Sequence, residues 1–189
     1  PGLREAGGQE PACAMCAVLA FAELGDTARA WELMNMINPA NRGGTAVGAA
    51  TYRVEPYVVT ADIYAMLPHA GRGGWSWYTG SAGCMYRLVL ESLLGAELDV
   101  DQLRFSPCLP ADWKELKMRY RFRETIYLIT VAQTATAERA ATVGGEGEIQ
   151  RDDTIHLKND GSEHAVKVDV GAATAGRRDT SRQPAQAGG

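Results

Sequence analysis

Hydrophobic residues in the first part of the chain recur with the spacing of helices. Residues 12–24 are apolar on nearly every side of a helix, which is typical of a buried helix. Gly25 ends this helix, and Asp26 can cap the next one, residues 27–37. That second helix has one apolar stripe, made of Ala30, Leu33, Met34 and Ile37. The pattern therefore predicts a buried inner helix followed directly by an amphipathic outer helix.

Two more apolar segments, residues 56–65 and 81–94, are predicted to be helices. Glycine-rich segments before them, residues 40–50 and 67–78, are predicted to be loops. In residues 81–94 the polar positions are few, so this helix too is expected to be buried on most sides. Its N-terminus can then point into a central cavity.

The hydrophobic period changes from helical to alternating after Gly95. Residues 117–123 alternate between basic and apolar side chains, which predicts a half-buried strand, and residues 125–131 form the returning strand. We interpret the basic face of the first strand as a solvated surface. Residues 155–157 and 165–170 are predicted to pair as a second hairpin around an Asn-Asp-Gly turn.

Composition and charge exclude several classes of protein. The 189 residues carry a net charge of −4, and no basic cluster suggests a nucleic-acid partner. No apolar run has the length of a membrane span. Residues 172–189 lack periodicity and are predicted to be a disordered tail. We expect the protein to lie in the cytoplasm, either by itself or as the soluble part of an inner-membrane protein.

The four cysteines are Cys13, Cys16, Cys84 and Cys108. The Cys-x-x-Cys spacing of the first two is compatible with a metal or redox site. A second close pair is absent from the sequence and the three histidines are scattered, so a zinc site is not favoured. We expect buried, reduced thiols on one apolar helix face, and no metal.

Candidate chemistry concentrates just before residues 81–94. Thr79 and Gly80 stand where that helix should begin, and a helix N-terminus presents free N–H groups and partial positive charge to an anion. An ordinary N-cap after a flexible loop is the alternative interpretation. Trp75, Trp77 and Tyr78 precede the cap, and their flat apolar faces favour a sugar site.

Three motifs resemble glycoside hydrolase family 94, whose members are inverting phosphorylases that split β-glucosides with phosphate. They are Glu-Pro-Tyr-Val-Val at residues 55–59, Pro-His-Ala-Gly-Arg-Gly-Gly at 68–74, and Trp-Ser-Trp-Tyr-Thr-Gly-Ser-Ala-Gly at 75–83. The likeness runs to about residue 170. It is greatest to the phosphorylase-like C-terminal region of cyclic β-1,2-glucan synthases and to β-1,2-oligoglucan phosphorylases.

The resemblance implies an α+β fold in two parts. Residues 1–96 would be the last helices of an (α/α)6 toroid, and residues 97–171 an antiparallel β-sandwich-like domain. The sequence starts abruptly, in what resembles the middle of a domain. We therefore expect a C-terminal part of a larger protein, with the remainder of that protein as its partner.

The resemblance also implies residue roles. It places a sugar-binding basic residue and glutamate on Arg4 and Glu5, where the residues alone favour a solvated ion pair. Asp62 falls near a sugar-contacting position, though the match is loose by one residue, and a helix-surface carboxylate is the alternative. Thr79 and Gly80 match the phosphate-contacting threonine and glycine. Inorganic phosphate would be a co-substrate, and no cofactor is implied.

This sequence departs from the family at three points. Ala12 occupies the position of a phosphate-contacting histidine, Glu10 adds a negative charge close to it, and Cys84 replaces a tryptophan. The general acid of the family is an aspartate upstream of any residue matched here, so we assign no catalytic residue. Two functions remain open: part of a β-1,2-glucan phosphorylase that yields α-glucose 1-phosphate, or a non-catalytic glucan-binding module with a decayed phosphate site.

Overall fold

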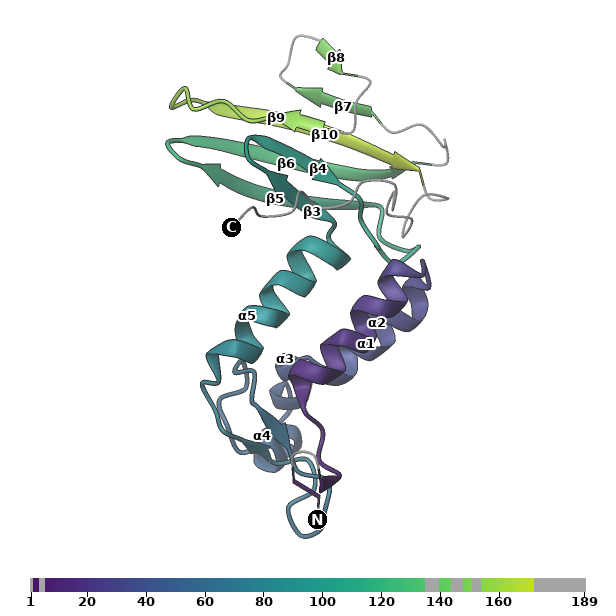
Figure 1. Ribbon diagram of the computed structural model, residues 1–189, viewed down its shortest axis with the longest axis vertical. Coiled ribbons are helices and arrows are strands. Elements are labelled where there is room, and N and C mark those ends of the chain that lie inside the picture. The colour runs from purple at the N-terminus through teal and green to yellow at the C-terminus, as the bar shows by residue number, and fades with distance from the viewer. Residues whose placement is uncertain (1, 4–5, 135–139, 144–147, 151–153, 172–189) are drawn as a thin grey trace, which may run out of the picture.

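The computed structural model describes residues 2–3, 6–134, 140–143, 148–150 and 154–171. Figure 1 shows helices and connecting loops at the end that holds the N-terminus, and strands stacked at the opposite end. The protein therefore has the predicted α+β fold, with its helices before its sheets. Arg4, Glu5 and the expected tail at 172–189 lie outside the described residues.

Helices α1 (Pro11–Glu23) and α2 (Thr27–Ile37) confirm the first two predicted helices. Pro11 suits the first helical position because its missing N–H is not needed there. The Asp26 side chain accepts a hydrogen bond from the Arg29 N–H at 3.0 Å and so caps α2. The predicted stripe faces inward: Ala30, Met34 and Ile37 are buried.

The prediction that α1 is buried on every side is wrong. Its buried residues are Pro11, Met15, Val18 and Ala22, which follow one face at helical spacing. Cys13 and Cys16 point to the opposite, exposed face, and Cys84 is exposed as well, so only Cys108 fits the expectation of buried thiols. The reason is that none of the described elements covers the other side of α1 (Figure 1).

Residues 40–50 are largely helical, contrary to the predicted loop. They contain α3 (Pro39–Gly43) and α4 (Ala46–Tyr52). Asn38 caps α3 by accepting from the Ala40 N–H at 3.0 Å, and Thr45 caps α4 by accepting from the Gly48 N–H at 3.0 Å. Two local caps thus stabilise short helices in a glycine-rich sequence.

The helix predicted for residues 56–65 is also wrong. The segment turns and enters β1 (Asp62–Ile63), which pairs antiparallel with β2 (Gly73–Gly74). Gly74 leaves room for the Tyr64 ring, because a Cβ there would lie 2.7 Å from it. A distant partner strand, which the local pattern cannot reveal, decides the conformation of this segment.

The predicted helix at 81–94 is confirmed, and it starts at Thr79, where the sequence places its N-terminus. The expectation that it is buried on most sides is wrong, because its buried residues follow one face: Ser81, Met85, Leu88 and Leu93. It consists of α5 (Thr79–Arg87) followed without a break by the π-helical segment η2 (Leu88–Leu93). Gly95 ends it with a φ of 69°, a left-handed conformation that favours glycine. The chain then passes directly into the first strand of the sheets.

Two sheets form the second part of the molecule. The three-stranded sheet has the order β3 (Ala96–Asp99), β4 (Gln102–Phe105), β9 (Thr154–His156). The five-stranded sheet has the order β5 (Glu115–Phe122), β6 (Thr125–Thr134), β10 (Glu163–Gly171), β7 (Ala140–Val143), β8 (Glu148–Gln150). Strands β5 and β6 are the predicted basic strand and its return, and β5 alternates between exposed and half-buried side chains as expected.

The second predicted hairpin is wrong. Strand β9 pairs with β4 in the smaller sheet, whereas β10 runs parallel to β6 in the larger one. The Asn-Asp-Gly turn therefore carries the chain from one sheet to the other. Both segments form strands as predicted, but β9 and β10 pair with β4 and β6, which lie earlier in the chain.

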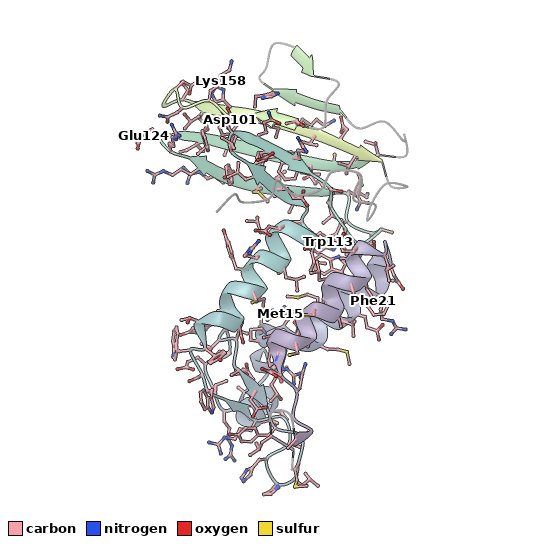
Figure 2. All side chains as sticks on the ribbon, in the orientation of Figure 1. Met15, Phe21, Asp101, Trp113, Glu124 and Lys158 are labelled. Carbon is pink, nitrogen blue, oxygen red and sulfur yellow. The ribbon has the colours of Figure 1, made fainter. Side chains whose placement is uncertain are left out.

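Apolar side chains of the two sheets form one shared core. Fully buried members come from both sheets: Leu103, Phe105, Tyr127, Ile129, Val131, Ile155 and Val168. Leu90 of η2 packs against this core from the helical side. At the junction the Trp31 indole N–H donates to the Cys108 carbonyl oxygen at 2.6 Å and the ring contacts Trp113 (Figure 2). These contacts join the helices to the sheets.

Candidate functional site

The first turn of α5 is an uncapped helix N-terminus. The helix begins at Thr79, as the sequence predicts, and the residue before it, Tyr78, makes no capping side-chain hydrogen bond. No acidic residue lies in the first turn. Helix α1 also lacks a side-chain cap at its N-terminus, Glu10, and runs beside α5 in the same direction (Figure 1). Both helix dipoles therefore point their positive ends to the same side of the molecule.

Ser81 adds a buried hydroxyl to this first turn. Its side chain is 1% exposed, and its Oγ has no hydrogen-bond partner among the described residues. Ser81 shares a helix face with Met85 and Leu88, which belong to the core formed with Met15 and Val18 of α1. Because side chains on a helix lean toward its N-terminus, the hydroxyl lies on the α1 side of the first turn. An unpaired buried hydroxyl is uncommon and points to a missing partner.

The sequence did not single out Ser81. Serine is ordinary in the first turn of a helix, and nothing in the local pattern indicates that this one loses all protein partners. Its burial depends on the packing of α5 against α1, which is visible only in three dimensions.

An aromatic loop leads into α5. Trp77 donates its indole N–H to Glu55 Oε1 at 3.0 Å, and its ring contacts Tyr57 edge to face. Trp75 contacts Tyr78 in the same manner. The predicted aromatic cluster therefore lies next to the helix N-terminus, and Glu55, which the sequence did not assign to the site, fixes one of its rings.

The N-terminal segment lies along β1, beside the same loops. Gln9 exchanges two backbone hydrogen bonds with Ile63, at 2.9 and 2.8 Å, and the Gly2 carbonyl oxygen accepts from the Ala65 N–H at 3.0 Å. The Arg42 guanidinium donates to Gln9 Oε1 at 2.6 Å and to the Met36 carbonyl oxygen at 2.7 Å. Arg4 and Glu5, the expected sugar-binding pair, lie outside the described residues, but these contacts hold the segment on both sides of them.

Asp62 stands on β1, opposite Gly74, and is 2% exposed. It is therefore not a carboxylate on a helix surface, because no helix forms here. The sugar contact implied by the resemblance stays a prediction.

Ala12, at the position of the family histidine, is the second residue of α1 and is half-buried. Cys84, at the position of the family tryptophan, is exposed on α5. The first departure removes a possible donor near the N-terminus of α1, and the second leaves a small side chain where a large ring would cover α5.

Burial alters the pKa of two groups that support the loops. The pKa of Arg42 is lowered, mainly by desolvation, and the pKa of Tyr52 is raised, again mainly by desolvation. The Tyr52 hydroxyl donates to the Val58 carbonyl oxygen at 2.8 Å. The hydrogen bonds of Arg42 and Tyr52 make both residues structural supports of the loops. Among the described residues, no three His, Cys, Asp or Glu side chains are grouped to hold a metal ion.

Comparison with known protein families identifies both parts of the chain. Residues 1–95 match the catalytic domain of the glycosyl hydrolase 94 superfamily, and residues 97–150 match the C-terminal domain of glycosyl hydrolase family 65. The chain belongs to the glycosyl hydrolase 94 superfamily, as the sequence motifs indicated. No helix in the described residues is long and apolar enough to cross a membrane.

Several curated relatives are similar over most of this chain. The cyclic beta-(1,2)-glucan synthase NdvB of Rhizobium meliloti is 45% identical over 133 residues, which are 70% of this chain and 5% of that protein. Solabiose phosphorylase of Paenibacillus borealis is 34% identical over 120 residues, 61% of this chain and 15% of that protein. The 1,2-beta-oligoglucan phosphorylase of Listeria innocua is 26% identical over 141 residues, 67% of this chain and 13% of that protein. The chain thus spans a small share of the length of these relatives.

Proposed function

We propose that this chain supplies the phosphate site and part of the sugar site of an inverting β-glucan phosphorylase. The observation that carries the proposal is the uncapped first turn of α5, where Thr79 and Gly80 stand beside the unpaired, buried Ser81 hydroxyl. Free N–H groups, one exposed hydroxyl and one buried hydroxyl form a donor set that suits a phosphate oxygen.

In the proposed reaction a phosphate oxygen attacks C1 of the sugar from the face opposite the glycosidic bond. The C1–O bond breaks, and the leaving oxygen takes a proton from a general acid. This chain would hold the phosphate in line for attack and would not supply the acid. Because phosphate itself is the nucleophile, no second carboxylate is needed to activate a water molecule.

The proposed substrate is β-1,2-glucan, and the product is α-glucose 1-phosphate. Two of the similar proteins are named for β-1,2-linked glucans, which supports this linkage, while solabiose phosphorylase is a relative with another substrate. Arg4, Glu5 and Asp62 would bind the sugar, with the N-terminal segment held against β1 by Gln9 and Arg42.

We further propose a division of labour within the chain. Residues 1–96 would be the end of a helical catalytic domain, and residues 97–171 a β-domain packed against it. The rest of the catalytic domain, including the general acid, would come from a longer polypeptide, since the relatives are many times longer than this chain. This part would lie in the cytoplasm, as the soluble part of the larger protein.

A non-catalytic glucan-binding module is the second candidate. Ala12 favours it, because an alanine at the N-terminus of α1 cannot donate the charge-assisted hydrogen bond that a histidine would give the phosphate. The two candidates differ in what they need: binding of a glucan requires the sugar site alone, whereas phosphorolysis requires both sites.

Glucose 1-phosphate release from β-1,2-glucan, measured in the complete protein across a phosphate titration, tests the proposal. We expect saturable release that Thr79→Ala shifts to higher phosphate, while Thr51→Ala, which removes a hydroxyl from exposed α4, has no effect. Release that Thr79→Ala leaves unchanged would refute the phosphate site. Glucan binding without any release would establish the non-catalytic candidate.

A further inference from the structure

Helix α1 begins without a local cap. Its N-cap residue, Glu10, makes no capping side-chain hydrogen bond, and the Glu10 carboxylate instead accepts from the Cys13 thiol at 3.5 Å. A capping side chain normally fixes the first turn by bonding to one of its N–H groups, and helix ends tend to fray. The start of α1 must therefore be held by contacts from other parts of the chain.

Gln9, the residue directly before this N-cap, is held by two other elements. Its backbone exchanges hydrogen bonds with Ile63 of β1, at 2.9 and 2.8 Å. Its side-chain Oε1 accepts from Arg42 Nη2 at 2.6 Å, and the same nitrogen donates to the Met36 carbonyl oxygen, in the last turn of α2, at 2.7 Å. Arg42 thus joins the end of α2 to the start of α1. We call the hydrogen bond between Arg42 and Gln9 the clamp.

The surroundings of Arg42 are unfavourable for a residue that only stabilises the fold. Its Nε is buried and has no hydrogen-bond partner among the described residues. The two acceptors of its Nη2, an amide oxygen and a backbone carbonyl oxygen, are both neutral. A buried N–H without a partner lowers stability, and such violations are concentrated at functional sites. This cost indicates a role for Arg42 beyond the stability of the fold.

We propose that Arg42 is a positioning residue for the proposed phosphate site, because its clamp replaces the missing cap of α1. A capping side chain would occupy N–H groups of the first turn, whereas the clamp acts on Gln9, outside the helix. The starts of α1 and α5 point to the same side of the molecule (Figure 1). The inference rests on the proposed function for the identity of the anion, and on the hydrogen bonds of Arg42 for the mechanism.

A cap for the C-terminus of α2 is the alternative role of Arg42. Basic side chains near the end of a helix bond to its last carbonyl groups, and the bond to Met36 does this. The bond to Gln9 is not needed for such a cap. Substitution of Gln9 therefore separates the two roles, because it removes the clamp and leaves the bond to α2 in place.

A phosphate titration of glucose 1-phosphate release in the complete protein tests the inference. Gln9→Ala and Arg42→Met should each raise the phosphate concentration for half-maximal rate roughly 2- to 10-fold, the effect of one hydrogen bond. The double variant should show no more than the larger single effect, because both substitutions remove the same bond. The maximal rate should change less than the phosphate requirement, since bound phosphate orders the turn again.

Two further variants serve as controls. Arg42→Lys keeps a charged donor and should recover most of the loss seen in Arg42→Met. Arg29→Met removes an exposed ion pair with Glu32 on α2 and should leave the phosphate requirement unchanged. A lower maximal rate with an unchanged phosphate requirement in Gln9→Ala would overturn the inference, because a loss of folded protein alone produces that result.

Amide hydrogen exchange of the first turn of α1 checks the mechanism. Without phosphate, exchange should be faster in Gln9→Ala than in the wild type, and inorganic phosphate should slow it again. Unchanged exchange overturns the clamp. Faster exchange with an unchanged phosphate requirement also overturns the inference, and assigns Arg42 to the fold alone.

The outcomes separate this inference from the proposed function. If no protein releases glucose 1-phosphate, calorimetric titration with inorganic phosphate replaces the rate measurement. Weaker phosphate binding by Gln9→Ala than by the wild type then supports the clamp although the phosphorylase function fails, whereas a wild type that binds no phosphate overturns both. If Gln9→Ala alters the phosphate requirement and Thr79→Ala does not, the clamp stands and the phosphate site at α5 is refuted.

Discussion

The sheets and the helices bury their apolar residues in different ways. In the sheets, two layers face each other and enclose residues such as Phe105 and Val131 completely. In the helices, α1 buries one face against α2 and α5, while its opposite face exposes Cys13 and Cys16. The sheets form a closed core, and the helices form a layer that is covered on one side.

This difference indicates where the molecule is structural and where it interacts. The proposed phosphate site, at the N-terminus of α5, lies at the end of the half-covered helical layer that is remote from the sheets (Figure 1). A layer with one open face can receive ligands and further protein elements. The sandwich, in contrast, ends the helical layer and tethers it through Trp31 and Cys108.

Thiol labelling should give the largest contrast between exposed and enclosed positions. Cys13, Cys16 and Cys84 are exposed and should react with a thiol reagent in the native protein. Cys108 is buried, its pKa is raised mainly by desolvation, and it should react only when the structure opens. Its rate should be lower by orders of magnitude, since opening of a core costs up to the roughly 5–15 kcal/mol of global unfolding.

Mass spectrometry of the labelled peptides over time provides the measurement, and denaturant provides the control in which all four cysteines react alike. Rapid labelling of Cys108 in the native protein would contradict the enclosed junction. Protection of Cys13, Cys16 and Cys84 in the complete protein would show that other elements cover the open face.

Truncation of one core side chain should sharpen the same contrast. Phe105→Ala should lower the free energy of unfolding by about 3–5 kcal/mol, because Phe105 is fully enclosed between the sheets. Leu24→Ala, at the exposed end of α1, should change it by less than about 0.5 kcal/mol. Equal losses in chemical denaturation of the two variants would refute the distinction between closed and open layers.

Restoring the family histidine should strengthen the phosphate site. Ala12→His would place an imidazole donor at the second residue of α1, beside the uncapped N-terminus. A hydrogen bond to a charged group is worth roughly 1.5–3 kcal/mol, so the phosphate concentration for half-maximal rate should fall on the order of 10- to 150-fold. Glu10 should mask part of the gain by attracting the imidazole.

The control for this substitution is Ala20→His, which adds a histidine to the exposed face of the same helix, away from the N-terminus. It should leave the phosphate requirement unchanged. Two results would mean that another group has replaced the histidine. One is an identical response of the phosphate requirement to both substitutions. The other is a wild-type enzyme that already saturates at low phosphate and that Ala12→His does not improve.

Removal of the Ser81 hydroxyl should affect function and stability in opposite directions. Ser81→Ala should raise the phosphate concentration for half-maximal rate about 2- to 10-fold, because a neutral hydrogen bond contributes roughly 0.5–1.5 kcal/mol. The free energy of unfolding should stay equal or increase, because Oγ has no partner to lose among the described residues. A destabilised variant with an unaltered phosphate requirement would assign Ser81 to packing alone.

The sequence predicted the elements whose conformation is decided locally. Helix α2 follows from its stripe and its Asp26 cap, and β5 from its strict alternation. The start of α5 at Thr79 follows from the glycine-rich segment before it. The position of Thr79 and Gly80 at the start of α5 was therefore accessible from the sequence alone, whereas their contact with phosphate stays a prediction.

The missed features depend on contacts between distant segments. Residues 56–65 resemble a helix until β2 is available as a partner for Asp62 and Ile63. Strands β9 and β10 resemble a hairpin until β4 and β6 are available as partners. The unpaired state of Ser81 likewise arises from the packing of α5 on α1, for which the local sequence carries no signal.

Acid should destabilise the turn between β9 and β10, at the end of the sheets remote from the helices. This effect on the unfolding temperature should be the smallest of the predicted effects. The Asp160 carboxylate accepts from the Ser162 N–H at 2.9 Å and the Thr125 hydroxyl at 3.2 Å, and it pairs with His164 Nε2 at 2.9 Å. The pKa of Asp160 is lowered, first by the backbone hydrogen bond from Ser162 and then by His164 and Thr125. These contacts fix the turn that carries the chain from β9 to β10, near Lys158 and Asp101 (Figure 2).

The sign of the pH effect follows from the direction of that shift. A carboxyl whose pKa is lower in the folded state than its ordinary value of about 3.9 stabilises the fold above that value, and this contribution is lost as the pH falls through the folded pKa. The unfolding temperature of the wild type should therefore decrease more steeply than that of Asp160→Asn from about pH 4 downward. Asp112→Asn, at an exposed residue near the junction, is the matched control and should follow the wild type. If the wild type and Asp160→Asn stay parallel down to pH 3, the Asp160 contacts do not stabilise the turn, and the sandwich is held at that end by its apolar core alone.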